Sequence, residues 1–187
     1  MKNFLLFLVL LSFCISVNSQ DRNDTYRFSF GVNAIDNSGR QSPFSNINDW
    51  AFIPAITIIG FEYRISNLFT IEELFSLNKF SSGYKIDGVA LNKDLRYFSA
   101  DTNIKYYIGE YFLNSEKIDL FLTAGLGFYD IDFNTFASAN LGGGFVFWFN
   151  DDIGIGVQSL GKFTLGDKDK QFSSNHLQYF LQLIYRN

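Results

Sequence analysis

The sequence has 187 residues, a formal net charge of −4 and a pI of about 4.9, and this acidic balance excludes the basic footprint of a nucleic-acid-binding protein. Aromatic residues make up 19% of the chain, with 23 Phe and 10 Tyr against only 2 Pro, which favours strands and membrane interfaces. The mean hydropathy of only +0.03 speaks against spanning helices beyond the N-terminus. It suits a transmembrane barrel, because half of each strand in such a barrel is polar.

At the N-terminus, residues 1–19 predict a cleavable secretory signal peptide. An early lysine precedes an apolar run over residues 4–17, and Ser19 supplies a small residue for cleavage. The run is shorter than the ~20 residues that a spanning helix needs. A lipoprotein signal at Cys14 is disfavoured because the residue before this cysteine is a phenylalanine. Residues 20–187 then predict a single barrel domain without cysteine, so it has neither disulfides nor thiolate metal sites.

Alternation of apolar and polar residues with a period of two predicts eight strands in this domain. Most of them reach the roughly nine to eleven residues that a tilted strand needs to cross a bilayer. The predicted strands are Tyr26–Ile35, Ile53–Ile65, Leu68–Leu77, Leu95–Ile108, Lys117–Tyr129, Ala137–Asn150, Ile153–Leu165 and His176–Arg186. We therefore expect an all-β fold, an eight-stranded antiparallel up-and-down transmembrane barrel.

The connections between the predicted strands alternate in length. The long ones are residues 36–52, 78–94, 130–136 and 166–175, and the short ones are residues 66–67, 109–116 and 151–152. Outer-membrane barrels have short periplasmic turns and longer outer loops, so the alternation predicts that both termini are periplasmic. In the first long connection, Phe44 and Trp50 are expected to fold back on the rim of the barrel.

Each predicted strand has one apolar face and one face of Gly, Ser, Thr, Asn and Gln with sparse charges. Small polar residues suit the narrow interior of an eight-stranded barrel, so we expect the apolar faces to contact lipid. Buried charges are tolerated mainly when paired, so the charges predict a lumen plugged by ion pairs. The predicted lumen charge network is Arg27, Glu62, Arg64, Glu72, Asp101, Lys105, Lys117, Asp119, Lys162 and Arg186. For each of these residues we favour filling of the interior over a role in conduction or catalysis.

The strand predicted over Leu68–Leu77 contains two adjacent glutamates, and only one of them can face the lumen. If Phe69, Ile71 and Phe75 face lipid, Glu72 points inward and Glu73 points toward lipid. A charge there is costly at the middle of a bilayer and less so near an interface. A bulge or an interaction partner at this strand is the other way to accommodate it.

Aromatic residues gather near the ends of the predicted strands, which is typical of the two aromatic girdles of a membrane barrel. The alternative is that they are ordinary strand-forming residues of a core. The residues predicted at the periplasmic interface are Tyr26, Phe61, Tyr63, Phe69, Tyr106, Phe147, Phe149 and Tyr185, and those at the outer interface are Phe98, Phe128, Phe163 and Tyr179.

The segments YRFSFGVNAIDNSGRQSPF, LFLTAGLGFYDID and ASANLGGGFVFWFNDDIGIGVQS resemble the eight-stranded outer-membrane barrel family and are similar to the N-terminal barrels of OmpA-like proteins. The resemblance implies a porin-like protein in the outer membrane of a Gram-negative cell. Its surroundings would be outer-membrane lipid, and other envelope proteins are candidate partners of its outer loops. Two features depart from the family. No peptidoglycan-binding domain is found, and the last residue is Asn187 rather than an aromatic, with Tyr185 as the expected substitute.

Some barrels of this size modify lipids, so His176, the single histidine, is a candidate base for Ser173 or Ser174. The histidine-x-serine spacing of barrel lipid deacylases is missing, because Gln178 stands where the serine would be. We therefore expect no catalytic residue. A lipid-modifying enzyme remains the less favoured alternative.

Metal and cofactor sites are not expected either. The acidic turns at residues 151–152 and 166–170 match no calcium-loop spacing, and the glycines at 142–144 are followed by neither the lysine nor the helix of a phosphate-binding loop. The function expected is an integral outer-membrane barrel with a structural or surface-interaction role, its lumen plugged or at most weakly conducting. The alternative is a soluble secreted ligand-binding barrel of lipocalin type, which requires the apolar faces to point inward.

Overall fold

The computed structural model describes residues 25–37, 47–111, 113, 115, 117–166 and 172–187. The predicted signal peptide and Phe44 lie outside the described residues. No helix within these ranges is long and apolar enough to span a membrane.

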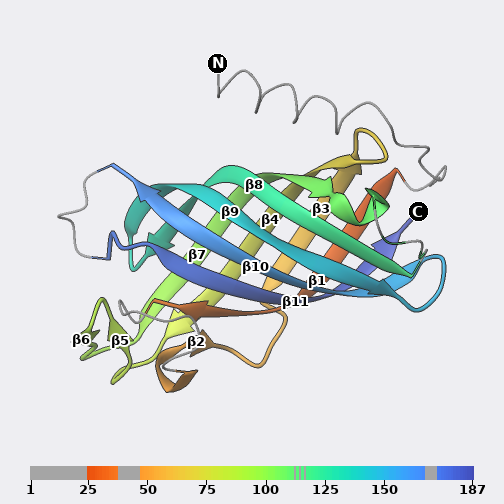
Figure 1. The fold of residues 1–187 in the computed structure, drawn as a ribbon. Helices are drawn as coiled ribbons and strands as arrows, with labels where there is room; N and C mark the ends of the chain where they lie inside the picture. The colour runs from red at the N-terminus through yellow and green to blue at the C-terminus, as the bar shows by residue number, and fades with distance from the viewer. Residues whose placement is uncertain (1–24, 38–46, 112, 114, 116, 167–171) are drawn as a thin grey trace, which may run out of the picture.

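Eight long antiparallel strands close into a barrel (Figure 1). The strands are β1 (Tyr26–Asp36), β3 (Ile58–Arg64), β4 (Phe69–Phe80), β7 (Leu95–Tyr107), β8 (Ile118–Ile131), β9 (Asn134–Trp148), β10 (Ile153–Leu165) and β11 (His176–Arg186). Each pairs with the next along the chain, and β11 pairs with β1 from Arg27 opposite Arg186 to Asp36 opposite Leu177. This last pairing leaves no open edge in the barrel. The all-β, eight-stranded, up-and-down architecture that the alternation predicts is confirmed.

The short elements distinguish the two ends of the barrel. The backbone N–H of Thr25 donates to the carbonyl oxygen of Asn187 (3.1 Å), so the first described residue and the C-terminus share one end, here called the terminus end. Figure 1 shows β2 (Ala51–Phe52), β5 (Lys85–Ile86) and β6 (Val89–Ala90) at the opposite end, called the loop end. The two 3₁₀ turns are η1 (Ile47–Asp49) and η2 (Ile108–Tyr111).

The β5–β6 hairpin occupies the connection predicted as a long loop over residues 78–94. Asp94 lies at the base of this hairpin and accepts hydrogen bonds from the backbone N–H of Ser82 (2.8 Å) and from Lys79 Nζ (2.9 Å). These donors, the backbone N–H first, lower the pKa of Asp94 below its ordinary value. The carboxylate therefore stays charged and ties the two sides of the hairpin together.

The second predicted strand is too long at its start. Its prediction began at Ile53, whereas β3 begins at Ile58. Pro54 has no backbone N–H to donate to a ladder, so proline within a sheet is confined to edges and strand starts. The segment before β3 still contacts β1 through a backbone hydrogen bond, which the N–H of Thr57 donates to the carbonyl oxygen of Gly31 (2.8 Å).

The loop predicted over residues 130–136 is wrong. β8 continues to Ile131 and β9 begins at Asn134, which leaves a two-residue turn at Asp132 and Phe133. Both turn residues have positive φ, 48° and 72°, as hairpin turns that match strand twist require. The predicted alternation of long and short connections therefore fails at this hairpin.

The rim prediction for Trp50 agrees with the structure. Its indole stacks on the ring of Tyr179 in β11, with centroids 4.9 Å apart and an interplanar angle of 16°. The chain after η1 is thus held against the wall of the barrel at the loop end.

The barrel has its polar side chains inside and its apolar side chains outside. Glu72, Lys105 and Lys162 are fully buried, whereas Leu126 and Leu141 on the outer wall are 63% and 60% exposed. A soluble lipocalin-type barrel needs the opposite arrangement. The structure therefore contradicts that alternative for this chain.

Glycines on the inner wall make room for the larger inward side chains of neighbouring strands. A Cβ at Gly127 of β8 would clash with the carboxylate of Asp101 on β7, and one at Gly125 would clash with the side chain of Asn103. Because both neighbours are buried, neither has free space to move into. These glycines are therefore required by interior packing.

We expect Gly127→Val to lower the free energy of unfolding of the refolded barrel by about 1–3 kcal/mol, because the added side chain overpacks the interior against Asp101. The measurement is a urea titration followed by tryptophan fluorescence. Ala124→Val is the matched control, since Ala124 lies on the exposed outer face of the same strand. Equal midpoints for the two variants would contradict this packing role.

Candidate functional site

A buried ion cluster lies in the lumen toward the terminus end. Lys105 Nζ is 2.5 Å from Glu62 Oε1 and 2.7 Å from Glu72 Oε1, and all three side chains are buried. The residues come from the adjacent strands β7, β3 and β4. Glu72 Oε2 also accepts from Asn103 Nδ2 (3.1 Å) and from Gln158 Nε2 (3.2 Å), which comes from β10. The carboxylate of Glu72 is thus stabilised by groups from well-separated strands.

A second group of side chains extends this cluster. Arg27 Nη1 lies 3.3 Å from Asp119 Oδ2 and donates to the hydroxyl of Tyr107 (2.9 Å), which in turn donates to Glu62 Oε2 (3.1 Å). Trp148 Nε1 donates to the same Asp119 oxygen (3.0 Å), and the guanidinium carbon of Arg27 lies 5.1 Å from the centroid of the Trp148 ring. The Arg27–Asp119 and Lys105–Glu62 ion pairs are therefore joined through Tyr107 into one hydrogen-bonded network.

A separate ion pair lies nearer the loop end. Lys162 Nζ is 2.5 and 2.6 Å from the two carboxylate oxygens of Asp101, and both side chains are fully buried. Asn140 Nδ2 donates to Asp101 Oδ1 (2.8 Å), and Ser99 Oγ donates to Oδ2 (3.3 Å). Charge-assisted contacts of this length are the strong ones, and here both carboxylate oxygens are satisfied.

Strand β7 shows how these polar layers are arranged along the barrel. From the loop end inward it presents Leu95 and Tyr97 in one apolar cluster, then Asp101 and Lys105 in the two ionic layers, and finally Tyr107 in a second apolar cluster. The first cluster also contains Ile35, Ala51, Phe80, Ile86, Tyr129, Ile131 and Phe136, and the second contains Phe121, Val146, Trp148 and Ile184. The ionic layers are therefore separated from both mouths by apolar side chains.

Three members of the predicted network lie elsewhere. Arg64 and Arg186 are half-buried at the terminus end, with their guanidinium carbons 5.6 Å from the Tyr107 ring centroid and 4.0 Å from the Trp148 ring centroid. Lys117 is exposed, so its placement in the lumen is wrong. It precedes β8, which begins one residue later, and so the alternation of that strand does not determine where it points.

Neutral side chains also hydrogen-bond to the buried charges, and the sequence does not predict these partners. Alternation places Tyr107 and Trp148 on the inner wall, where both are buried. They lie in aromatic-rich strand ends, next to residues predicted for the membrane interface, so they do not stand out as partners of the charges. Alternation predicts that Gln158 faces the lumen, but nothing in the sequence identifies the partners of Gln158 and Asn140, which lie on other strands.

The adjacent glutamates face as the register predicts. Glu72 points into the lumen, and Glu73 lies on the outer wall, where it accepts a hydrogen bond from Thr102 Oγ1 (3.0 Å). The outward carboxylate therefore has one donor from the neighbouring strand.

His176 lies buried inside the loop end of the barrel. Its Nε2 is 2.9 Å from the hydroxyl of Tyr97, and its Nδ1 is 3.4 Å from the carbonyl oxygen of Ser174. The hydroxyl of Ser174 donates instead to Asn37 Oδ1 (2.6 Å). The two ring nitrogens thus contact a phenol and a backbone carbonyl rather than a serine nucleophile. Within the described ranges no group of three or more His, Cys, Asp or Glu could hold a metal ion.

The aromatic residues predicted for the membrane interfaces lie on the outer wall. At the terminus end, Phe69 and Tyr106 stack with centroids 4.9 Å apart, and Tyr26 and Tyr63 lie 5.4 Å apart. At the loop end the outward aromatics are Phe98, Phe128, Phe163 and Tyr179, and the remaining ones at the terminus end are Phe61, Phe147, Phe149 and Tyr185. Their contact with a membrane interface stays a prediction.

No family model and no curated protein matches the sequence. Among solved structures, the barrel is similar to Neisserial surface protein A, with a TM-score of 0.58 at 12% identity over 86% of this chain and 95% of that one. It is also similar to the outer membrane protein OprG from Pseudomonas aeruginosa, with a TM-score of 0.57 at 8% identity over 92% of this chain and 99% of that one. The N-terminal barrel of OprF from the same organism has a TM-score of 0.54 at 10% identity over 88% of this chain and 98% of that one. At these identities the likeness shows the fold alone, the outer-membrane barrel fold that the sequence resemblance predicts.

We expect Lys105→Met to lower the free energy of unfolding by about 3–5 kcal/mol, because it leaves Glu62 and Glu72 buried without their cation. Denaturant unfolding of the refolded barrel in vesicles measures this loss. Adding Glu62→Gln and Glu72→Gln to the same chain should restore most of it, since no buried charge is then left unpaired.

Lys79→Met is the control for this experiment, because Lys79 pairs with Asp94 on the exposed surface and its loss should change stability little. If Lys105→Met proved no more destabilising than this control, the interior network would not stabilise the barrel.

Proposed function

We propose that this chain is an integral outer-membrane protein. The observation that supports this most strongly is the reversed facing of the barrel, with ion pairs inside and exposed Leu, Ile and Phe side chains around the outer wall. Every long strand except β3 has 11 to 15 residues, enough to cross a bilayer at the usual tilt of roughly 45°. The outer membrane protein OprG from Pseudomonas aeruginosa has a barrel of this fold.

The proposed orientation places both termini in the periplasm. The terminus end carries the tight β3–β4 and β9–β10 connections and the longer β7–β8 connection with η2. The loop end carries β2 and the β5–β6 hairpin, and the short β8–β9 turn is its exception. Short periplasmic turns and longer outer loops are the usual asymmetry of such barrels. The loop end then faces the outside of a Gram-negative cell.

The proposed role is structural or one of surface interaction, without catalysis. Two ionic layers between two apolar clusters fill the lumen along β7 and so favour a closed interior over a conducting one. The surroundings of the protein are outer-membrane lipid. Its partners, including other envelope proteins, would meet it at the loop end.

Replacing an outward leucine with arginine tests the membrane location. We expect Leu126→Arg, near the middle of β8, to lower the free energy of unfolding from vesicles by about 2–4 kcal/mol, because the charge must enter the lipid. The matched control is Val89→Arg in the β5–β6 hairpin, since Val89 is 65% exposed and Leu126 is 63% exposed. A soluble barrel would tolerate both changes equally, so equal effects, or recovery of the wild-type protein in the soluble periplasmic fraction, would sink the proposal.

A conductance measurement tests the closed lumen. We expect the refolded wild-type protein to insert into planar bilayers without a stable open level, because apolar clusters cover both ends of the ionic layers. Insertion is checked by heat-modifiable migration on unboiled gels. A large, long-lived conductance from the inserted protein would contradict the closed interior.

A further inference from the structure

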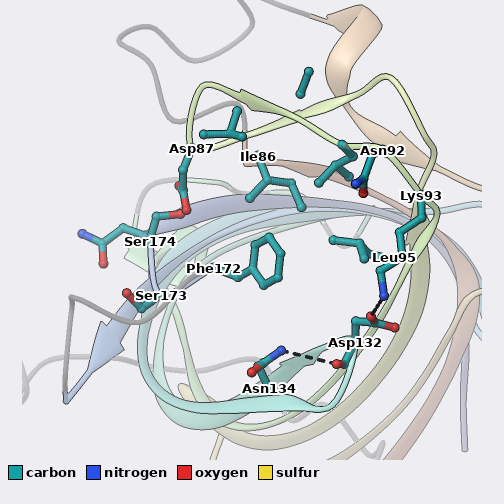
Figure 2. Close-up of a pocket in the computed structure, with 14 residues that line it drawn as sticks. Ile86, Asp87, Asn92, Lys93, Leu95, Asp132, Asn134, Phe172, Ser173 and Ser174 are labelled. Carbon is teal, nitrogen blue, oxygen red and sulfur yellow. Dashed lines mark hydrogen bonds and ion pairs between the residues drawn. The ribbon is translucent and has the colours of Figure 1, made fainter.

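A cavity of about 950 Å³ opens at the loop end of the barrel (Figure 2). Three segments line it: the β5–β6 hairpin with the residues up to Leu95, the β8–β9 turn, and residues 172–175 before β11. The volume lies within the roughly 300–1,000 Å³ of small-molecule sites. The cavity is large enough for a ligand of several rings and is formed entirely by loop-end residues.

The floor of the cavity is apolar. Ile86 and Leu95 are buried in the loop-end apolar cluster, and Phe172 packs against the same cluster. Figure 2 shows the ring of Phe172 over the mouth of the barrel, with Ile86 and Leu95 beside it. A ligand in this cavity would therefore meet an aromatic face and two aliphatic side chains.

The rim of the cavity is polar. Asp87, Asn92 and Asn134 carry exposed carboxylate and amide groups. Among the described residues of the lining Lys93 is the one lysine, and its Nζ lies 2.6 Å from Asp132 Oδ2, so its charge is neutralised by the opposite wall. The ion pair also connects the hairpin to the β8–β9 turn, as Figure 2 shows.

Phe133 is 80% exposed and belongs to the same turn as the lining residue Asp132, although its own ring does not line the cavity. It lies between Asp132 and Asn134, both of which line the cavity, and its φ of 72° is uncommon for an aromatic residue. The guanidinium carbon of Arg96 lies 4.5 Å from the centroid of the ring and covers one face of it. The ring adds nothing to the core, and its backbone is strained, which points to a use outside the fold.

We propose that the cavity and the open face of Phe133 bind a neutral oligosaccharide. A sugar ring has an apolar face that can pack on Phe172 and Phe133, and hydroxyls that both donate and accept hydrogen bonds. The carboxylate of Asp87 accepts hydrogen bonds, and the amide of Asn92 both donates and accepts them. The amide oxygen of Asn134 is an acceptor, because its Nδ2 already donates to the carbonyl oxygens of Ile131 and Asp132. This assignment rests on the proposed function, because only an outward-facing loop end would meet sugars of a cell surface or the medium.

The charges of the rim disfavour other ligand classes. Asp87 would repel a sulfated or phosphorylated glycan, and Lys93 and Asp132 compensate each other, so neither of these two offers a free charge to a ligand. An acyl chain would fill the floor but would strip water from the rim carboxylates and amides without replacing their hydrogen bonds. A neutral polyhydroxylated ligand can pack its apolar face on the floor of the cavity and hydrogen-bond to the rim through its hydroxyls.

The test is binding of the refolded protein, in lipid nanodiscs, to an array of neutral and of sulfated or sialylated oligosaccharides. We expect retention of neutral glycans, followed by saturable calorimetric titration with the best of them. Phe133→Gly should weaken this binding at least tenfold while the melting temperature stays equal or rises, because glycine adopts a positive φ without strain. Ala90→Trp, which places a large side chain in the cavity from an exposed position, should weaken it by a similar factor.

Ile65→Gly is the control, since Ile65 is an exposed apolar residue at the opposite end of the barrel and its loss should leave binding unchanged. Retention of anionic glycans alone, no retention of any neutral glycan, or binding that survives both cavity variants would overturn the assignment. Heat-modifiable migration and bilayer insertion of the same sample separate the two proposals. An inserted barrel that binds no sugar refutes only the sugar site, whereas a protein that fails to insert refutes the outer-membrane proposal.

Discussion

The burial of Lys105 between Glu62 and Glu72 is the interaction on which the rest of the structure depends. An ammonium group with no exposure to water is tolerable only because two carboxylates approach it within 2.5 and 2.7 Å. Placing these groups on the inner wall commits the alternate residues of the same strands to the outer wall, and most of those residues are apolar. An apolar exterior in turn requires that every backbone group be satisfied within the barrel, which the pairing of β11 with β1 achieves.

The interior explains why small residues accompany the charges. Asp101 can reach Lys162 across the lumen because Gly127 on the neighbouring strand leaves space for its carboxylate. Apolar side chains, many of them aromatic, fill the lumen at the loop end and at the terminus end. The two ionic layers between them are therefore shielded from water. A barrel of this kind has its capacity for recognition at its rim, where the β5–β6 hairpin and the β8–β9 turn surround the cavity whose floor includes Phe172.

Much of the architecture could be predicted from alternation alone, because a strand with one polar face determines the facing of all its residues once the polar face is assigned to the lumen. Arg27, Asp101 and Lys162 were found in this way. Lys117 was misplaced because alternation says nothing beyond a strand end, and the turn at Phe133 was missed because it lacks the Gly or Asn that marks such turns. Cross-lumen partners such as Gln158 could not be predicted, because they depend on the curvature that closes the barrel.

Site-directed spin labelling can establish whether the apolar outer wall of the barrel contacts lipid or water. Outside residues 1–19 the chain has no cysteine, so single cysteines at positions 122 and 126 of β8 can be labelled cleanly in reconstituted vesicles. We expect labels at these outward positions to be readily relaxed by lipid-soluble oxygen and poorly by a water-soluble nickel complex. Strong relaxation of both labels by the nickel complex would show that this face contacts water, and would contradict the membrane barrel described here.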